Sequence, residues 1–424
     1  MSVSEWKRYT VQELVDLKML DKPLDGNHGG IHPKTSDYVI CGVPFIMAND
    51  LKNGKVDYGC CNFITEKQAK TLKKGFAKHG DVLLTHKATM GRTAIVDNSH
   101  PYIVLTPQVT YYRVLMGIYN KYLKYYFDSK DFQDILLNWS GSGSTRAYLG
   151  ITGQRKLPII LPPLPEQKAI ADTISCLDDK IELNNRINKT LEEMAKAIFK
   201  SWFVDFEPFQ DGEFEDSELG RIPKGWRVGT ISDLGSVIGG STPSKACAEY
   251  YTDSGIAWIT PKDLSNNKDK FISKGEIDIT DLVLKNSSTK IMPKGTVLFS
   301  SRAPIGYIAI AKNNVTTNQG FKSVVPESNI GTEYVYCFLK SNVDVIENRA
   351  TGSTFKEVSG SVMKQIPALI PSDSVLSKFQ QIFNMYFEQQ MQIECQNQTL
   401  IAIRDSLLPK LMSGEIRVPL EEVK

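Results

Sequence analysis

An internal repeat that runs through nearly the whole chain constrains its fold more than any other feature. WKRYTVQEL near the start matches WRVGTISDL, GVPFIMANDL matches GIAWITPKDL, and GDVLLTHKATMGRTAIVDN matches GTVLFSSRAPIGYIAIAKN. LTPQ matches TTNQ, which pairs Gln108 with Gln319, and SGSGSTRAYLGITGQRKLPIILP matches TGSTFKEVSGSVMKQIPALIP. A repeat of half-chain length predicts two similar globular domains.

Each copy begins as a β-rich segment. Short apolar runs such as DVLLT and YIAIA alternate with Gly, Pro and Asn, which is typical of strands joined by tight turns. YNKYLKYYFDS and GTEYVYCFLKS each predict one short helix. The pattern therefore indicates an α+β domain of about 150 residues in each half, a usual domain size.

Each copy then continues into a long heptad-patterned segment without internal turns. In the first, apolar residues alternate in steps of four and three, with two asparagines at seam positions: Ile170, Ile174, Leu177, Ile181, Asn184, Asn188, Leu191 and Ile198. The second places Gln389 and Gln396 in a seam formed by Phe379, Ile382, Tyr386, Ile393, Leu400, Ile403 and Leu407. Each helix would be about 35 residues, or roughly 50 Å, and cannot bury its stripe alone. We expect the two to pair within the chain as an antiparallel coiled coil; the alternative is that each packs on its own domain or on another protein.

The expected architecture is thus α+β, with two repeated recognition domains separated by a pair of long helices and related by pseudo-twofold symmetry. The predicted segments are a first domain at 1–160, a central helical region at 161–209, a second domain at 210–370 and a C-terminal helical region at 371–424. Five carboxylates lie between Asp211 and Glu218, so 210–220 is expected to be an exposed linker.

Bulk composition excludes some classes of protein and favours no chemistry by itself. Residues 1–160 carry 21 basic and 14 acidic side chains, net +7, whereas residues 211–370 carry 18 of each. The first domain could therefore attract a polyanion, which is weak evidence for nucleic acid. No apolar stretch is long enough for a membrane helix, and the N-terminus lacks a signal-peptide pattern, so we expect a cytoplasmic protein. The seven cysteines show no zinc spacing and are expected to be reduced thiols.

A search for catalytic motifs finds no complete constellation. The chain has no dinucleotide or phosphate-binding glycine motif, no nucleophile elbow, and no Asn-Pro-Pro-aromatic segment of the kind that amino-methyltransferases use. Glu166 and Lys168 superficially fit half of a nuclease site, but Glu166 follows LPPLP, where a helix start explains it. We therefore expect no catalytic site and no bound metal or cofactor.

Matched polar loops remain as candidates for a DNA-binding site. THKATMGR and SSRAPIG follow a strand, Gln108 and Asn318-Gln319 offer amides, and each Gly-Ser-Thr stretch precedes a cation. Arg suits guanine, Asn and Gln suit adenine, and hydroxyls with Lys suit phosphates. The plainer interpretations are solvated loop charges, amides that tie strands together, and tight turns. The candidate DNA-binding residues are Lys87, Arg92, Gln108, Ser144, Thr145, Arg146, Ser300, Ser301, Arg302, Asn318, Gln319, Ser353, Thr354 and Lys356.

Taken in order, these motifs resemble one family. LPPLPEQKAIADTISCLDDKIELNN, IFKSWFVDFEPF, ELGRIPKGW, TNQGFKSVV, GSTFKEV and LLPKLMSGEI occur in the order typical of DNA-specificity subunits of type I restriction–modification systems. The resemblance covers nearly the whole chain, and the ordered set is specific where single motifs are not. LTPQVTYYR in the first domain, which contains Gln108, departs from the family-like TNQGFKSVV, which contains Gln319.

The resemblance implies a non-catalytic subunit whose two domains each read half of a split double-stranded DNA target. The helices would set the half-site spacing, about one turn or roughly 10 base pairs, and dock two methyltransferase subunits. Those partners would bring S-adenosylmethionine, and motor–nuclease subunits would use ATP and Mg²⁺ to cleave DNA. One alternative is an adaptor that holds two proteins without binding DNA. Another is a self-sufficient methyltransferase or nuclease, which would need a cofactor motif that the sequence lacks.

Overall fold

The computed structural model describes residues 6–141, 147–352 and 356–419, and the chain divides into two compact units. Unit 1 contains Met1–Ile181 and Thr399–Lys424, and unit 2 contains Glu182–Gln398. The helices α6 (Leu164–Phe203) and α13 (Asp373–Ser413) each contribute to both units. The predicted domain borders at 160 and 370 fall at the ends of two short strands that lead into these helices.

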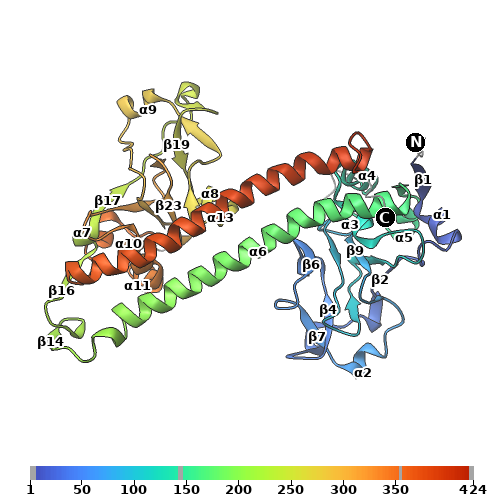
Figure 1. Cartoon of the computed structure of the whole chain (residues 1–424), viewed down its shortest axis with the longest axis horizontal. Helices are drawn as coiled ribbons and strands as arrows, with labels where there is room; N and C mark the ends of the chain where they lie inside the picture. The colour runs from blue at the N-terminus through green and yellow to red at the C-terminus, as the bar shows by residue number, and fades with distance from the viewer. Residues whose placement is uncertain (1–5, 142–146, 353–355, 420–424) are drawn as a thin grey trace. The chain divides into compact units, whose positions relative to one another are not determined.

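Unit 1 is built on two mixed sheets that lie beside the first half of α6, blue and cyan in Figure 1. The six-stranded sheet has the order β2 (Leu24–Asp25), β12 (Val109–Tyr112), β9 (Val82–Thr85), β10 (Thr93–Ile95), β6 (Gly54–Val56) and β5 (Leu51–Lys52). The five-stranded sheet has the order β3 (Tyr38–Val39), β7 (Asn62–Ile64), β4 (Val43–Ile46), β11 (Ile103–Leu105) and β8 (Phe76–Ala77). The smaller elements are α1 (Val11–Asp16), α2 (Glu66–Ala69), α5 (Ile151–Gln154) and the pair β1 (Lys7–Thr10) and β13 (Pro158–Leu161).

Unit 2 repeats this plan, in yellow and orange in Figure 1. Its sheets have the orders β17 (Gly235–Gly239), β25 (Lys322–Pro326), β22 (Val297–Ser301), β23 (Ile305–Ala311), β20 (Phe271–Ile272), and β18 (Tyr251–Thr252), β21 (Ile277–Ile279), β19 (Ile256–Ile259), β24 (Thr316–Thr317). The strands β16 (Arg227–Thr230) and β26 (Pro367–Ile370) pair as β1 and β13 do. The small helices are α7 (Ile231–Leu234), α8 (Pro261–Asn266), α9 (Asp281–Asn286) and α12 (Gly360–Lys364).

The repeat in the sequence corresponds to equivalent local structure in the two units. Thr10 and Thr230 each begin a short helix, and the carboxylate three residues later, Glu13 or Asp233, accepts the threonine N–H. Each predicted short helix exists, as α3 (Asn120–Asp128) and α10 (Thr332–Ser341), and each is followed by a second that was not predicted, α4 (Lys130–Trp139) and α11 (Val343–Asn348).

The region predicted to be an exposed linker has regular structure of its own. After a short 3₁₀ turn at Glu207–Phe209, β14 (Phe214–Ser217) and β15 (Gly220–Pro223) form an antiparallel hairpin. Most residues from 210 to 220 are exposed, as the carboxylates predicted, but the segment is not an unstructured connection.

Within each unit the two long helices run antiparallel, which confirms the predicted pairing. In unit 2, Asn184 of α6 contacts Asn397 of α13 and the ring of Phe199 contacts that of Phe379, so residue numbers rise along one helix as they fall along the other. In unit 1, Asp178 of α6 contacts Arg404 of α13. Both helices also enter the domain cores: Ile170 and Ile174 of α6 and Leu411 of α13 pack in the core of unit 1. The alternative interpretation, packing on the adjacent domain, therefore holds together with the antiparallel pairing of the helices.

The seam of the second helix differs from the predicted one. Ile403 is exposed, and Ile382, Tyr386, Ile393, Leu400 and Leu407 are only half-buried. Between residues 379 and 407 the buried positions are Phe379, Phe383, Phe387, Gln390, Glu394 and Asn397. Gln389 and Gln396, expected in the seam, are both exposed. The three phenylalanines decide this register because their rings fill the core of the second domain. In the first helix, Ile170, Ile174, Asn184 and Leu191 are buried as expected, Leu177, Ile181, Asn188 and Ile198 are half-buried, and Phe199 is buried beside Ile198.

Candidate nucleic-acid interface

In unit 2, three polar loops meet at the end of strand β22. The Ser301 N–H donates to the Gly320 carbonyl at 2.8 Å, which places Arg302 beside the turn that contains Asn318 and Gln319. Arg302 also forms an isolated antiparallel bridge with Glu357, and the Val358 N–H donates to the Ser301 carbonyl at 3.0 Å. The predicted site residues Arg302, Asn318, Gln319 and Lys356 are thus gathered at one edge of the sheet.

At this edge Glu357 forms ion pairs with two cations. Arg302 Nη1 lies 3.6 Å from a Glu357 carboxylate oxygen, and Lys322 Nζ lies 3.3 Å from the other. Lys356 and Gln319 are exposed, whereas the Asn318 Oδ1 accepts the Gly320 N–H at 2.9 Å and so holds the turn. Ser353 and Thr354 lie outside the described residues.

Two of the predicted DNA-binding residues lie inside the sheet. Ser300 and Ser301 are fully buried in β22. The Ser300 hydroxyl donates to the Pro304 carbonyl and accepts the Tyr307 N–H, both at 2.8 Å, and the Ser301 hydroxyl donates to the Gly320 carbonyl at 3.2 Å. These hydroxyls tie the loop to the sheet, because buried polar groups need partners inside the protein. The sequence shows that both serines lie next to Arg302, but it does not show that their side chains point into the sheet.

Unit 1 has the corresponding arrangement at the end of β9. Lys87 is exposed and forms an isolated antiparallel bridge with Tyr148, whose ring centroid lies 5.8 Å from the Lys87 ammonium. Arg92 is exposed and closes the same loop, since its backbone N–H donates to the Thr85 hydroxyl at 2.8 Å. Ser144, Thr145 and Arg146 lie outside the described residues.

His86 positions this edge and was not predicted as a site residue. It is fully buried, its backbone N–H donates to the Gln108 carbonyl at 3.0 Å, and its carbonyl accepts the Leu149 N–H at 3.1 Å. Burial lowers the pKa of His86 to about 4, so the ring is neutral near pH 7, with its Nδ1 proton donated to the Leu149 carbonyl. Its alignment opposite Ser301 in the repeat is the signal that could have found it.

The structure also corrects the pairing of Gln108 with Gln319 by one residue. Gln108 accepts from the residue before Lys87, as Gly320 accepts from the residue before Arg302. On the other side of the turn, the Thr106 N–H donates to the last residue of β4, as the Asn318 N–H donates to the last residue of β19. Gln108 therefore corresponds to Gly320, and Pro107 corresponds to Gln319. Gln108 is half-buried at the strand start, which sets it apart from the exposed Gln319.

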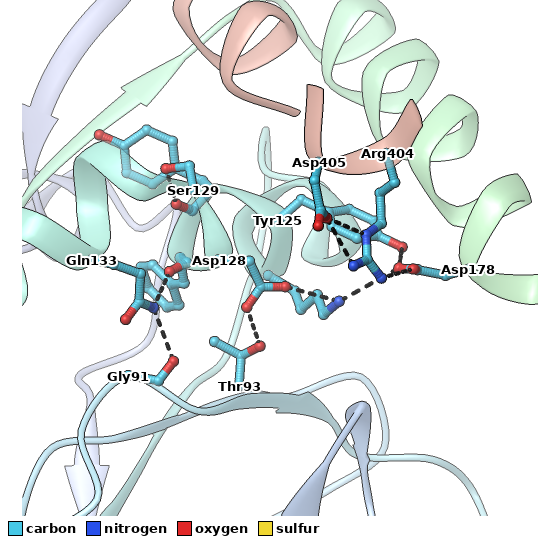
Figure 2. Close-up of polar contacts among 12 residues, drawn as sticks. Gly91, Thr93, Tyr125, Asp128, Ser129, Gln133, Asp178, Arg404 and Asp405 are labelled. Atoms are coloured by element: carbon cyan, nitrogen blue, oxygen red, sulfur yellow. Dashed lines mark hydrogen bonds and ion pairs between the residues drawn. The ribbon is translucent and has the colours of Figure 1, made fainter. Parts of the chain in front are cut away.

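A chain of polar contacts links the site of unit 1 to the helices beside it (Figure 2). Gln133 of α4 donates to the Gly91 carbonyl at 2.9 Å, which fixes the loop that carries Lys87. Asp128 of α3 accepts from Thr93 of β10 and pairs with Lys124 at 2.9 Å. Asp178 of α6 then accepts from Tyr125 of α3 at 2.7 Å and pairs with Arg404 of α13 at 2.9 Å. The loop, its domain helices and both long helices are thus connected within one unit.

In the part of the chain that the structure describes, no group of His, Cys, Asp and Glu side chains is placed to hold a metal ion. Among the same residues, no helix is both long and apolar enough to cross a membrane. All seven cysteines are free thiols, and Cys61 and Cys337 are buried. We call the edge that carries Lys87 in unit 1 and the edge that carries Arg302 in unit 2 the two loop edges. They present hydrogen-bond donors, amides and cations, which are groups typical of a binding site.

Comparison with known proteins agrees with the geometry. A sequence profile of the type I restriction modification DNA specificity domain matches residues 3–193 and again residues 223–402. The specificity subunit of the type I restriction enzyme HindI of Haemophilus influenzae is 27% identical over 98% of this chain and all of that protein. The MjaIX specificity subunit of Methanocaldococcus jannaschii is 44% identical over 42% of this chain and 41% of that protein.

The fold has a solved counterpart. The S subunit of the type I restriction–modification system of M. genitalium superposes with a TM-score of 0.60 at 17% identity, covering 97% of each chain. At this identity the likeness concerns the fold alone.

Proposed function

This chain belongs to the family of type I restriction–modification DNA specificity subunits, and we propose that its two recognition domains each read one half of a bipartite double-stranded DNA target. The observation that carries the proposal is the duplicated loop edge. Lys87 follows β9 and Arg302 follows β22, each bridged to the segment that leads toward a long helix. One edge in each unit is what a protein needs to read two separated half-sites.

The residues of the two edges suit the two parts of DNA recognition. Arg302 with Asn318 and Gln319 supplies groups that match base edges in the major groove. Lys356, Lys87 and Arg92 are exposed cations that suit phosphates and fix the register on the duplex. Because the residues facing each other differ between the units, the two half-sites are expected to differ in sequence.

The helices supply the remaining parts of the proposal. A continuous pair of helices of 40 and 41 residues can fix a spacing between half-sites and present a surface to two methyltransferase subunits. Those subunits would bind S-adenosylmethionine and modify the base, and motor–nuclease subunits would bind ATP and Mg²⁺. The chain itself would bind none of these cofactors and perform no chemistry, in accord with the sequence search, which found no catalytic constellation.

Mapping of methylated bases tests the proposal. Host DNA would be sequenced for modified bases with the gene intact, deleted, and restored. We expect one split motif to vanish on deletion and to return on restoration. A methylation map that is unchanged by deletion, in a strain where the methyltransferase partners are expressed, would reject the proposal and favour an adaptor role.

A further inference from the structure

The two loop edges differ in the residue that faces the cation, and this difference has a consequence for DNA binding. Lys87 faces the ring of Tyr148 in unit 1, while at the corresponding bridge in unit 2 Arg302 faces the carboxylate of Glu357. Tyr148 leaves the charge of Lys87 in place. Glu357 instead opposes the charge of Arg302.

Glu357 contacts more than one cation. Its two carboxylate oxygens lie 3.6 Å from Arg302 and 3.3 Å from Lys322, which comes from the neighbouring strand β25. The Lys322 side chain is only 15% exposed, whereas those of Arg302 and Glu357 are about a third exposed. The backbone of Glu357 is held from both sides, since it bridges Arg302 on one side and pairs with Thr351 at 2.9 and 3.0 Å on the other. The backbone contacts and the two ion pairs together hold the carboxylate beside Arg302 and Lys322.

A phosphate and a base edge would experience this carboxylate differently. A phosphate that approaches Arg302 or Lys322 is repelled by the charge of Glu357 and must also separate it from its partners. A cytosine or adenine amino group can donate to the carboxylate while Arg302 donates to a neighbouring guanine, so a correct base edge satisfies both groups. The same carboxylate thus penalises phosphate contacts and rewards one set of base edges.

We propose that Glu357 is a specificity-determining residue of the second half-site, which restrains Arg302 and Lys322 from binding phosphates so that they engage DNA only where base edges replace the ion pairs. This inference rests on the proposed function, because it presumes that the edge of unit 2 faces DNA. In unit 1, by contrast, Tyr148 exerts no such restraint on Lys87.

The test measures binding of the full chain, with its methyltransferase partners, to two duplexes by fluorescence anisotropy over a range of salt concentrations. One duplex carries the target defined by methylation mapping, and the other has the same composition in scrambled order. The variants are Glu357→Gln, Tyr148→Phe, and the matched control Glu213→Gln, which removes a carboxylate from an exposed pair with Lys224 in the hairpin of the same unit. Thermal unfolding of each variant confirms that it folds.

We expect Glu357→Gln to bind the scrambled duplex roughly three- to tenfold more tightly, as release of one partly screened charge would produce. The slope of log affinity against log salt should steepen by about 0.9 for each phosphate newly contacted. Discrimination against single base-pair changes should fall in the second half-site and stay intact in the first. Glu213→Gln and Tyr148→Phe should bind the scrambled duplex as the natural protein does.

Unchanged or weaker binding of Glu357→Gln to the scrambled duplex overturns the inference while the proposed function stands. An equal rise in Glu213→Gln also overturns it, because the effect would then reflect net charge alone. Failure of the natural protein to distinguish the two duplexes would overturn the proposed function and this inference together.

Discussion

Asn184 of α6 donates its side-chain N–H to the Asn397 side-chain oxygen of α13 at 2.8 Å, and both residues are buried between the helices of unit 2. Asn184 donates equally to Gln396, and Asn397 donates to Asn185 at 2.8 Å. Most shifts of α6 along α13 would leave at least one of these amides without a partner. The asparagines therefore specify how the two helices align. The polar seam positions are therefore a device for alignment.

Removal of one amide should cost more than removal of both. Asn184→Leu leaves the Asn397 oxygen buried without its donor, and we expect a loss of about 1–3 kcal/mol in unfolding free energy. The Asn184→Leu, Asn397→Leu double variant should recover part of that loss, which a double-mutant cycle in urea would measure. Asn188→Leu is the matched control, since the Asn188 Oδ1 has no hydrogen-bond partner among the described residues. Removal of this amide should change the unfolding free energy very little. Additive single effects would contradict the pairing.

The spacing function predicts a specific result for an insertion. Four residues added to α6 after Asn184, with four added to α13 before Asn397, lengthen each helix by about 6 Å while preserving the pairing on either side. Methylation mapping should then show a longer gap between unchanged half-sites, by about two base pairs at 3.4 Å each. The same insertion in α6 alone separates Asn188 from Gln390 and should abolish modification. Altered half-site sequences would contradict the ruler role.

Arg302→Ala should relax recognition at one position of the second half-site and leave the first half-site unchanged. A bidentate contact of arginine with guanine typically contributes about 1–3 kcal/mol of discrimination against the wrong base. Binding to a set of duplexes with single base-pair changes measures this directly. Lys356→Ala provides the contrast, because an exposed lysine on a phosphate should weaken all sequences by a similar factor. A uniform loss for Arg302→Ala would reassign it to the phosphate backbone.

Glu394 should make the stability of unit 2 depend on pH. Its carboxylate is buried, accepts the N–H groups of Lys270 and Phe271, and lies beside Asp269 and the Lys270 ammonium, which itself contacts Gln390 and Glu192. Burial raises the pKa of the Glu394 carboxyl from its ordinary value of 4.5 to about 7, despite the backbone N–H groups that oppose the rise.

Between these two values the folded protein holds a proton that the unfolded chain releases. The contribution of Glu394 to stability is therefore fully present below about pH 4.5 and is lost as the pH rises to about 7. We expect the change in unfolding midpoint between pH 5.5 and 7.5 to become smaller in Glu394→Gln. Equal pH dependence in both proteins would show that Glu394 titrates as it does in water.

Much of the organisation is written locally in the sequence and follows from it. The half-chain repeat, the Gly-bounded strands and the heptad spacing are visible in the sequence, so the duplicated domains and the antiparallel helices could be predicted. The repeat also made the two loop edges predictable, because each copy places a cation at the end of an equivalent strand.

Tertiary structure decided which side chain of a pattern faces which partner. The side chains of Ser300 and Ser301 point inward, where their hydroxyls donate to backbone carbonyls. Gln108 corresponds to Gly320 and not to Gln319, because strand pairing sets the register of the turn. The phenylalanines rather than the isoleucines of α13 define its seam, because only contacts with the second domain's core distinguish two neighbouring apolar stripes. Such choices depend on residues more than a hundred positions away, as Lys270 and Glu394 illustrate, and local spacing carries no record of them.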